Sequence, residues 1–96
     1  MTAYVIADVR LTGDADELAE YRSKVIATLE PYGGKYLARG GPVTVVEGDW
    51  EPGQLVVVEF PTVEAARSWN ESAAYQEIAP LRSRNTDSRR LIVEGL

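Results

Sequence analysis

The sequence contains no cysteine and no histidine. Without cysteine, the chain can form no disulfide, no thiolate nucleophile and no zinc site of the cysteine type. Without histidine, it lacks an imidazole base that titrates near neutral pH, a serine–histidine triad and the proximal histidine ligand of haem. These two absences exclude much of ordinary enzyme chemistry.

Long hydrophobic runs are also absent. No apolar stretch approaches the length of a membrane span, and no basic and then apolar leader precedes the first strand-like pattern. We therefore expect a cytoplasmic protein. The net charge of −5 argues against nucleic acid and anionic membrane as partners. The one local exception is the segment 82–90, which has four arginines and a single acidic residue, Asp87.

The remaining composition is that of a small globular protein. The 96 residues are 45% hydrophobic and 26% charged, which suits a single domain over residues 1–96 and argues against disorder. The hydrophobic core of so short a chain is marginal, so assembly into an oligomer would stabilise it.

The order of the expected elements predicts the fold. Strands are expected at residues 3–11, 35–39, 43–47, 55–60 and 90–94. The first helix is expected between its cap Asp14 and Pro31, and a second begins at Thr62, breaks at Ser72 and kinks or ends at Pro80. This order predicts an α+β, ferredoxin-like β-α-β-β-α-β fold with an extra hairpin strand at 43–47. Two helices are expected on one face of its antiparallel sheet.

The face of the sheet away from the helices is expected to be apolar as well. Alternation along the strands assigns seven aliphatic residues to it: Ile6, Leu37, Val43, Val45, Leu55, Val57 and Ile92. Leaving them exposed would forfeit roughly 10–20 kcal/mol gross, at ~1.5–3 kcal/mol for each side chain. Since a whole domain is stable by only about 5–15 kcal/mol, we predict a homodimer that packs sheet against sheet.

Several motifs spread over the whole chain resemble one family. They are YGGKYLARGG at 32–41, EGDW at 47–50, EFP at 59–61, then Ala65, Ala66, Trp69, Ser72 and Tyr75, and VEG at 93–95. Together they resemble the domain of unknown function 1330 family. The resemblance implies a dimeric α/β-barrel, in agreement with the two apolar faces, and it implies no general activity.

The chain departs from that family at two positions. Asn70 stands where the family often has a second aromatic residue after the tryptophan, and Ala73 stands where it often has proline. If the aromatic residue helps to line a pocket, the resemblance implies a roomier or more polar pocket in this chain.

Ionisable residues on the partner-facing side of the sheet are the first candidates for chemistry. Asp8 and Glu59 are expected on neighbouring strands, where apolar surroundings would raise the pKa of a carboxyl group enough for general acid or base catalysis. Arg39 is expected nearby, where it could bind an acidic ligand. The alternative is a cluster of ion pairs that fixes the register of the dimer.

Aromatic residues are the candidates for a ligand pocket. Trp69 and Tyr75 could floor a pocket between helix and sheet, although aromatic residues at helical spacing more often belong to the core. If the protein is an enzyme, Tyr36 and Trp69 would shape its cavity. The arginines of segment 82–90 could receive an anion, with a solvated loop paired to acidic helix faces as the alternative.

Three functions are therefore considered. The first is a binding protein for a small apolar or acidic metabolite held in the barrel. The second is a cofactor-free enzyme of the monooxygenase, isomerase or cyclase type, with Asp8 or Glu59 as its base, by analogy of fold alone. The third is a dimeric module without a ligand. We expect no cofactor, and the spacing of Asp8, Glu47 and Glu59 does not support a metal site.

Overall fold

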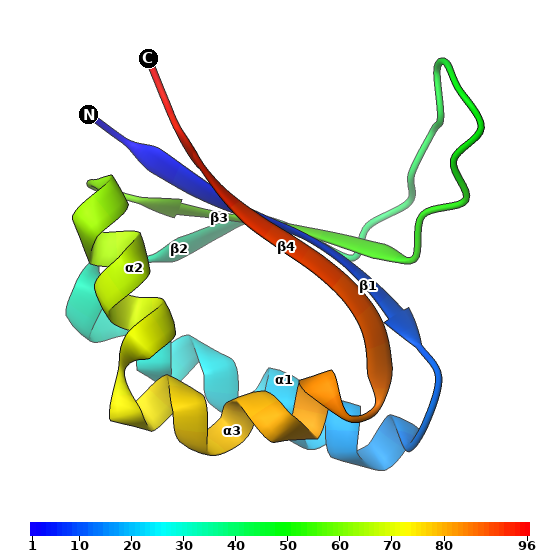
Figure 1. Cartoon of the computed structure of the whole chain (residues 1–96), viewed down its shortest axis with the longest axis horizontal. Helices are drawn as coiled ribbons and strands as arrows, with labels where there is room; N and C mark the ends of the chain where they lie inside the picture. Colours follow the sequence, from blue (N-terminus) through cyan, green and yellow to red (C-terminus); the bar gives the residue numbers. More distant parts are fainter.

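The protein is a single four-stranded antiparallel sheet with helices on one face (Figure 1). The computed structural model describes all 96 residues. The elements are β1 (Ala3–Leu11), α1 (Ala15–Leu29), the 3-10 helix η1 (Glu30–Tyr32), β2 (Lys35–Arg39), β3 (Gln54–Phe60), α2 (Val63–Glu71), α3 (Ala73–Ser83) and β4 (Thr86–Glu94). The strand order is β2-β3-β1-β4, which confirms the predicted α+β ferredoxin-like fold. No helix combines the length and apolar character needed to cross a bilayer.

The three main helices begin at predicted caps. The side chains of Asp14, Thr62 and Ser72 each accept a hydrogen bond from the backbone of the helical turn that follows. The extended backbone at Ser72 also separates α2 from α3, as predicted. Of the two outcomes predicted at Pro80, a kink or an end, the end is wrong, because α3 continues to Ser83. Its packing against α1 outweighs the one backbone hydrogen bond that proline cannot donate.

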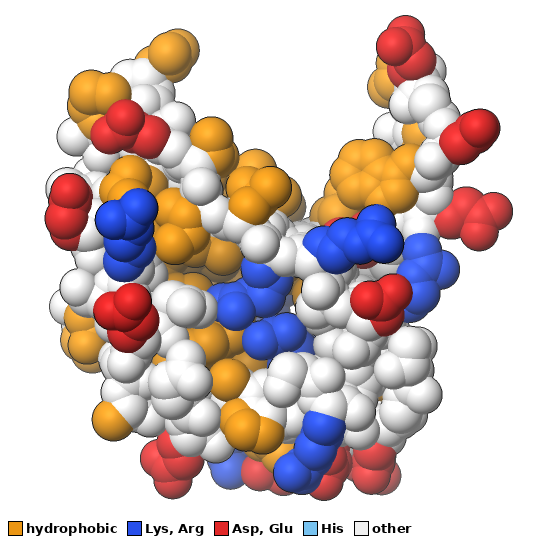
Figure 2. Space-filling view, viewed as in Figure 1, with side chains coloured by type: hydrophobic (Ala, Val, Ile, Leu, Met, Phe, Trp, Pro, Cys, Tyr) orange, Lys and Arg blue, Asp and Glu red, His pale blue; other side chains and the backbone are white.

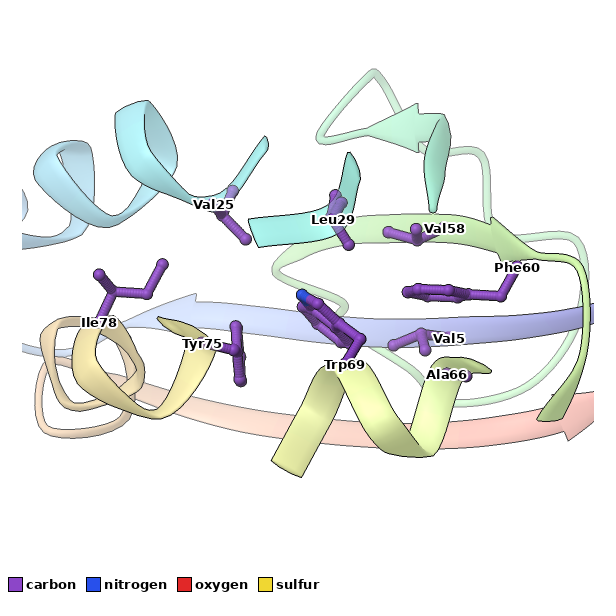
Figure 3. Close-up of a cluster of buried hydrophobic side chains, with 9 residues drawn as sticks. All are labelled: Val5, Val25, Leu29, Val58, Phe60, Ala66, Trp69, Tyr75 and Ile78. Atoms are coloured by element: carbon purple, nitrogen blue, oxygen red, sulfur yellow. The ribbon is translucent and has the colours of Figure 1, made fainter. Parts of the chain in front are cut away.

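The core lies between the sheet and the helices (Figure 3). Phe60 and Tyr75 are fully buried and lie on either side of Trp69, with ring centroids 5.4 and 4.2 Å from the Trp69 ring. The Trp69 indole nitrogen donates to Thr28 Oγ1 at 3.0 Å, so its polar atom is satisfied inside the core. This aromatic stack fixes α2 and α3 against the inner face of the sheet.

Residues 40–53, between β2 and β3, form no strand and project from the sheet as an arm (Figure 1). The predicted hairpin strand at 43–47 is therefore wrong. β2 pairs with β3 instead, and the arm leaves Val46 92% and Trp50 53% exposed. A β-prone composition suits any extended segment, whether or not another strand lies beside it.

A β-bulge at Leu37 changes which residues of β2 face the helices. Tyr36 lies opposite Val58 and Arg39 opposite Val56, so both side chains are on the helix-covered face. Simple alternation placed Arg39 on the other face, and that prediction is wrong because the bulge inserts one residue into the strand.

The face of the sheet that no helix covers is called the open face below. On β4, Ile92 lies opposite Val5 and faces the helices, whereas Leu91 lies opposite Ile6 on the open face together with Val93. The sequence predicted Ile92 on the open face and Leu91 and Val93 on the helix-covered face. These assignments are wrong, since a shift of one residue in register exchanges the two faces of a strand. The open face is nevertheless apolar as predicted, with Ile6, Leu91 and Val93 37%, 55% and 44% exposed.

Candidate ligand-binding site

A cavity of about 190 Å³ lies between the helix-covered face of the sheet and the helices. Its apolar lining comes from inward-facing residues of β1 and β3 and from the buried stripe of α1. Seventeen residues line it, and eleven of them are hydrophobic. Strand alternation places small residues such as Ala7 at its floor, which leaves room that larger side chains would fill. The cavity therefore suits a small ligand with an apolar body.

Three of the four predicted ligand-binding residues line this cavity: Arg39, Tyr36 and Trp69. Tyr75, the fourth, is fully buried, does not line the cavity and packs against Trp69 with its ring tilted by 46°. The cavity lies within one subunit, on the opposite side of the sheet from the open face. Arg39, which the sequence placed on the partner-facing side of the sheet, thus shares this cavity with Tyr36 and Trp69.

The two predicted catalytic carboxylates lie outside the cavity. Asp8 and Glu59 are both on the open face, where Asp8 lies opposite Leu55 and Glu59 lies opposite Tyr4. They are four residue positions apart along the β1–β3 ladder, or ~13 Å at about 3.3 Å per residue. The expected cluster of Asp8, Glu59 and Arg39 therefore does not form.

Each of these carboxylates has a local structural partner. Asp8 accepts hydrogen bonds from the Trp50 indole nitrogen at 3.1 Å and from the backbone N–H of Gly53 at 2.8 Å, which ties the arm to β1. Glu59 lies 3.5 Å from the Lys35 ammonium group on β2. No three acidic side chains come together in a way that could hold a metal ion.

Four arginines line the cavity, namely Arg22, Arg39, Arg82 and Arg90. No aspartate or glutamate lines it, although the chain has fifteen of them, and none of the three salt bridges involves these arginines. Basic side chains lie near the centre of the face drawn in Figure 2, and acidic ones lie mainly around its edge. The cavity is thus a positively charged, largely apolar space in an acidic protein.

Aromatic rings and amide groups hold two of these guanidinium groups in place. The Arg39 guanidinium carbon lies 4.6 Å from the Tyr36 ring centroid. That of Arg90 lies 5.7 Å from the Trp69 centroid, and Arg90 Nη2 donates to Asn70 Oδ1 at 2.9 Å. Asn70 is the residue that departs from the family pattern. In this chain it orients an arginine at the cavity, which agrees with a more polar pocket.

Arg82 is the most deeply buried of the four. Its residue is only 7% exposed, its Nε has no hydrogen-bond partner, and its guanidinium carbon lies 5.8 Å from the Tyr21 ring centroid. A buried charged group without a partner is unfavourable for the folded state. The Nη groups of Arg82 make no hydrogen bond within the chain and are not among its fully buried atoms, so they are the donors available at the cavity.

The cavity also contains phenol groups that stay protonated. The Tyr21 hydroxyl lies 2.9 Å from that of Tyr75, and burial raises the pKa of Tyr21, with Tyr75 raising it further. Burial likewise raises the pKa of Tyr36. These groups can donate hydrogen bonds to a ligand, but none is suited to act as a phenolate base near neutral pH.

The sequence did not identify Arg22, Arg82 and Arg90 as cavity residues. The arginines of the basic segment 82–90 have different roles. Arg84 pairs with Glu17 on the surface, whereas Arg82 and Arg90 turn toward the cavity. The signal that could have found Arg82 is its position four residues after the buried Ile78, on the inner side of α3.

A comparison with known families confirms the family resemblance that the sequence motifs indicate. The family described as domain of unknown function 1330 matches residues 2–96. The chain belongs to this family. No protein of curated function matches it.

Solved structures confirm the fold of this family member. RPA0582 of Rhodopseudomonas palustris, a protein of unknown function, is 22% identical with a TM-score of 0.76, over 99% of this chain and 82% of that one. A dimeric ferredoxin-like protein of unknown function from Jannaschia sp. CCS1 is 12% identical with a TM-score of 0.74, over 99% and 100% of the two chains. SnoaB of Streptomyces nogalater, a cofactor-independent oxygenase, is 10% identical with a TM-score of 0.67, over 99% and 93%. At these identities the likeness establishes a shared fold.

Proposed function

We propose that the protein is a homodimer that binds a small, largely apolar metabolite in the cavity of each subunit. The observation that carries the proposal is the cavity of about 190 Å³, with aliphatic walls and with Trp69 and Tyr36 among its lining residues. A concave, mostly apolar space with a few polar groups converging on it is the usual form of a small-molecule site. That the protein is cytoplasmic stays a prediction from the sequence.

The open face supports the homodimer. Ile6, Leu91 and Val93 form a continuous apolar surface across β1 and β4, and the arm adds exposed Val46 and Trp50 next to the sheet. Structural neighbours with this fold are dimeric proteins. Burial of apolar surface in a second copy would contribute roughly 25 cal/mol for each Å² removed from water, which favours sheet-to-sheet packing.

Sedimentation velocity at micromolar concentration tests the dimer. We expect the wild-type protein to sediment as a dimer and Leu91→Glu, on the open face, to sediment as a folded monomer. Ile26→Glu is the matched control, because Ile26 is 45% exposed on α1, away from the open face. A wild-type monomer, or dimerisation unaffected by Leu91→Glu, would contradict this part of the proposal.

Tryptophan fluorescence tests ligand binding. The chain has two tryptophans, so Trp50→Phe leaves Trp69, at the cavity wall, as the only indole. We expect single-ring aromatic compounds, neutral or acidic, to change the emission of Trp69 in a saturable way. Ala7→Leu, which fills the cavity, should abolish the change, whereas Ala27→Leu on the exposed side of α1 should leave it intact. A panel with no saturable response would refute the binding function.

The geometry favours binding over a cofactor-free enzyme that uses a side-chain base. SnoaB shares the fold, but fold does not determine function. Asp8 and Glu59, the carboxylates considered as bases, lie on the other face of the sheet from the cavity. Inside the cavity the ionisable groups are arginines and tyrosines, which bind and orient rather than abstract protons at neutral pH.

A further inference from the structure

The cavity that we propose as a ligand site contains one deeply buried charged side chain, Arg82, for which the chain supplies no hydrogen-bond acceptor and no salt bridge. Arg82 is more than nine-tenths buried, and its Nε makes no hydrogen bond. Removing a guanidinium group from water is costly unless an anion or hydrogen-bond acceptors replace the water. Since no carboxylate of this chain lines the cavity, a bound anion would supply what is missing.

The other cavity arginines strengthen this requirement. Arg22, Arg39 and Arg90 also lack a salt bridge, and Arg39 and Arg90 are oriented by the faces of aromatic rings. Several like charges around a space with low-dielectric walls concentrate a positive potential there. That arrangement is unfavourable in an empty cavity and favourable once a negative charge enters.

The size and lining of the cavity limit the rest of the ligand. A protein cavity of ~150 Å³ holds one benzene molecule, so a space of about 190 Å³ accommodates one ring and a small substituent. The aliphatic walls from β1 and β3 suit a hydrocarbon body. A planar guanidinium group matches the two oxygens of a carboxylate.

We propose that the cavity selects small aromatic carboxylates and that Arg82 binds the carboxylate group. This inference rests on the proposed binding function and adds to it the chemical class of the ligand and its anchor. In this arrangement the ring lies among the aliphatic and aromatic walls, and the carboxylate accepts hydrogen bonds from the guanidinium group of Arg82. The alternative is that Arg82 only packs against the Tyr21 ring as part of the fold.

A comparison of benzoate with its neutral analogue benzamide tests the selection without any variant. The two probes have nearly the same shape and differ in charge. We expect benzoate to bind at least about tenfold more tightly in the wild-type protein, since hydrogen bonds to charged groups are the stronger ones. Equal affinities would overturn the selection for acids and leave the binding function standing. Failure of both probes, and of every neutral ring compound, would refute the binding function itself.

Variants then test the anchor. Arg82→Gln should reduce the affinity for benzoate about tenfold or more, to near that for benzamide, which should itself change little. Arg67→Gln is the matched control, because it removes the same charge from an exposed site on α2 outside the cavity, and should leave both affinities unchanged.

The stability of Arg82→Gln separates anchoring from packing. If the main role of Arg82 is to bind the carboxylate of the ligand, Arg82→Gln should leave the denaturant midpoint of the ligand-free protein unchanged or raise it. The reason is that the substitution removes an unsatisfied buried charge. Arg82→Lys keeps the charge but lacks the planar guanidinium group, so its affinity for benzoate should lie between those of the wild-type protein and Arg82→Gln. A lowered midpoint together with unchanged benzoate affinity would overturn the proposal.

Discussion

Asp8 of β1 accepts a hydrogen bond from the indole nitrogen of Trp50, 3.1 Å away and 42 positions later in the chain. Its second carboxylate oxygen accepts from the backbone N–H of Gly53, and Arg10 donates to the carbonyl oxygen of Glu51. These contacts attach the base of the arm to the end of β1. Asp8, a candidate base from the sequence alone, therefore has a structural role in this subunit.

Replacing Asp8 should loosen the arm without affecting the cavity. Asp8→Ala removes an acceptor shared by two donors, so local opening of residues 40–53 should become easier and cleavage there about tenfold faster. A glutamate-specific protease measures this, since Glu47 and Glu51 lie in the arm. Benzoate affinity should not change, because Asp8 lies on the open face.

Asp49→Ala is the control for this prediction, because Asp49 is exposed in the same arm. It should leave the cleavage rate close to that of the wild-type protein. If Asp8→Ala and Asp49→Ala are cleaved at the same rate, Asp8 does not hold the arm.

Gly53 lies where the arm approaches β1 too closely for a larger residue. A Cβ atom at this position would collide with the backbone carbonyl group of Val9 on β1. We expect Gly53→Ala to lower the free energy of unfolding by ~1–3 kcal/mol, as for other overpacked sites, in urea denaturation. At Gly41, in the same arm, a Cβ atom would meet nothing within 4 Å, so Gly41→Ala should cost much less. Equal losses in the two variants would contradict the close approach at Gly53.

Local signals in the sequence predicted the elements well. Asp14, Thr62 and Ser72 mark the beginnings of helices because a short polar side chain satisfies backbone N–H groups within its own turn. The nearly continuous apolar run LVVVEF is typical of a strand in the middle of a sheet. The structure agrees, because β3 lies between the neighbouring strands β2 and β1. Each of these signals depends on residues close together in the sequence.

The faces of the strands were harder to predict, and the candidate site depends on them. A bulge at Leu37 moved Arg39 to the cavity, and a one-residue difference in the register of β4 turned Arg90 inward and Arg89 outward. Alternation gives two sets of residues on each strand but does not say which set faces the helices when both are partly apolar. Alternation assigned Asp8 and Glu59 to the correct, open face, whereas it assigned Arg39 to the wrong one.

The hydroxyl groups of Tyr21 and Tyr75 satisfy each other beside the cavity, 2.9 Å apart. Tyr75→Phe or Tyr21→Phe alone leaves one hydroxyl group without its partner, which should cost ~1–2 kcal/mol of unfolding free energy. The double variant should lose less than the sum of the two, because it leaves no orphaned group. Guanidinium denaturation of the four proteins in this cycle measures the coupling.

Tyr32→Phe provides the reference for that cycle, since the Tyr32 hydroxyl group makes no hydrogen bond and its removal should change stability by less than ~0.5 kcal/mol. Additive losses in the cycle would mean that the two tyrosines act independently, despite the short distance between them.

Glu17 should make stability depend on pH in the acid range. It accepts two hydrogen bonds from Arg84 and one from Asn85, each at 2.7 Å, and the Arg84 interaction is the largest cause that lowers the pKa of Glu17 from 4.5 to about 2. A pKa that is lower in the folded state stabilises the protein above the unfolded-state value, and the stabilisation is lost as the pH falls. The contribution of Glu17 should therefore be complete above about pH 4.5 and disappear toward pH 2.

Urea denaturation of Glu17→Gln at several pH values measures this contribution. The variant should be less stable than the wild-type protein at pH 6, and the difference should shrink steadily between about pH 4.5 and pH 2, where the wild-type carboxyl group becomes protonated. Glu64→Gln is the matched control, because Glu64 is also acidic in the first turn of a helix but is exposed. A difference for Glu17→Gln that stays constant with pH would show that the side chain acts through packing and not through its charge.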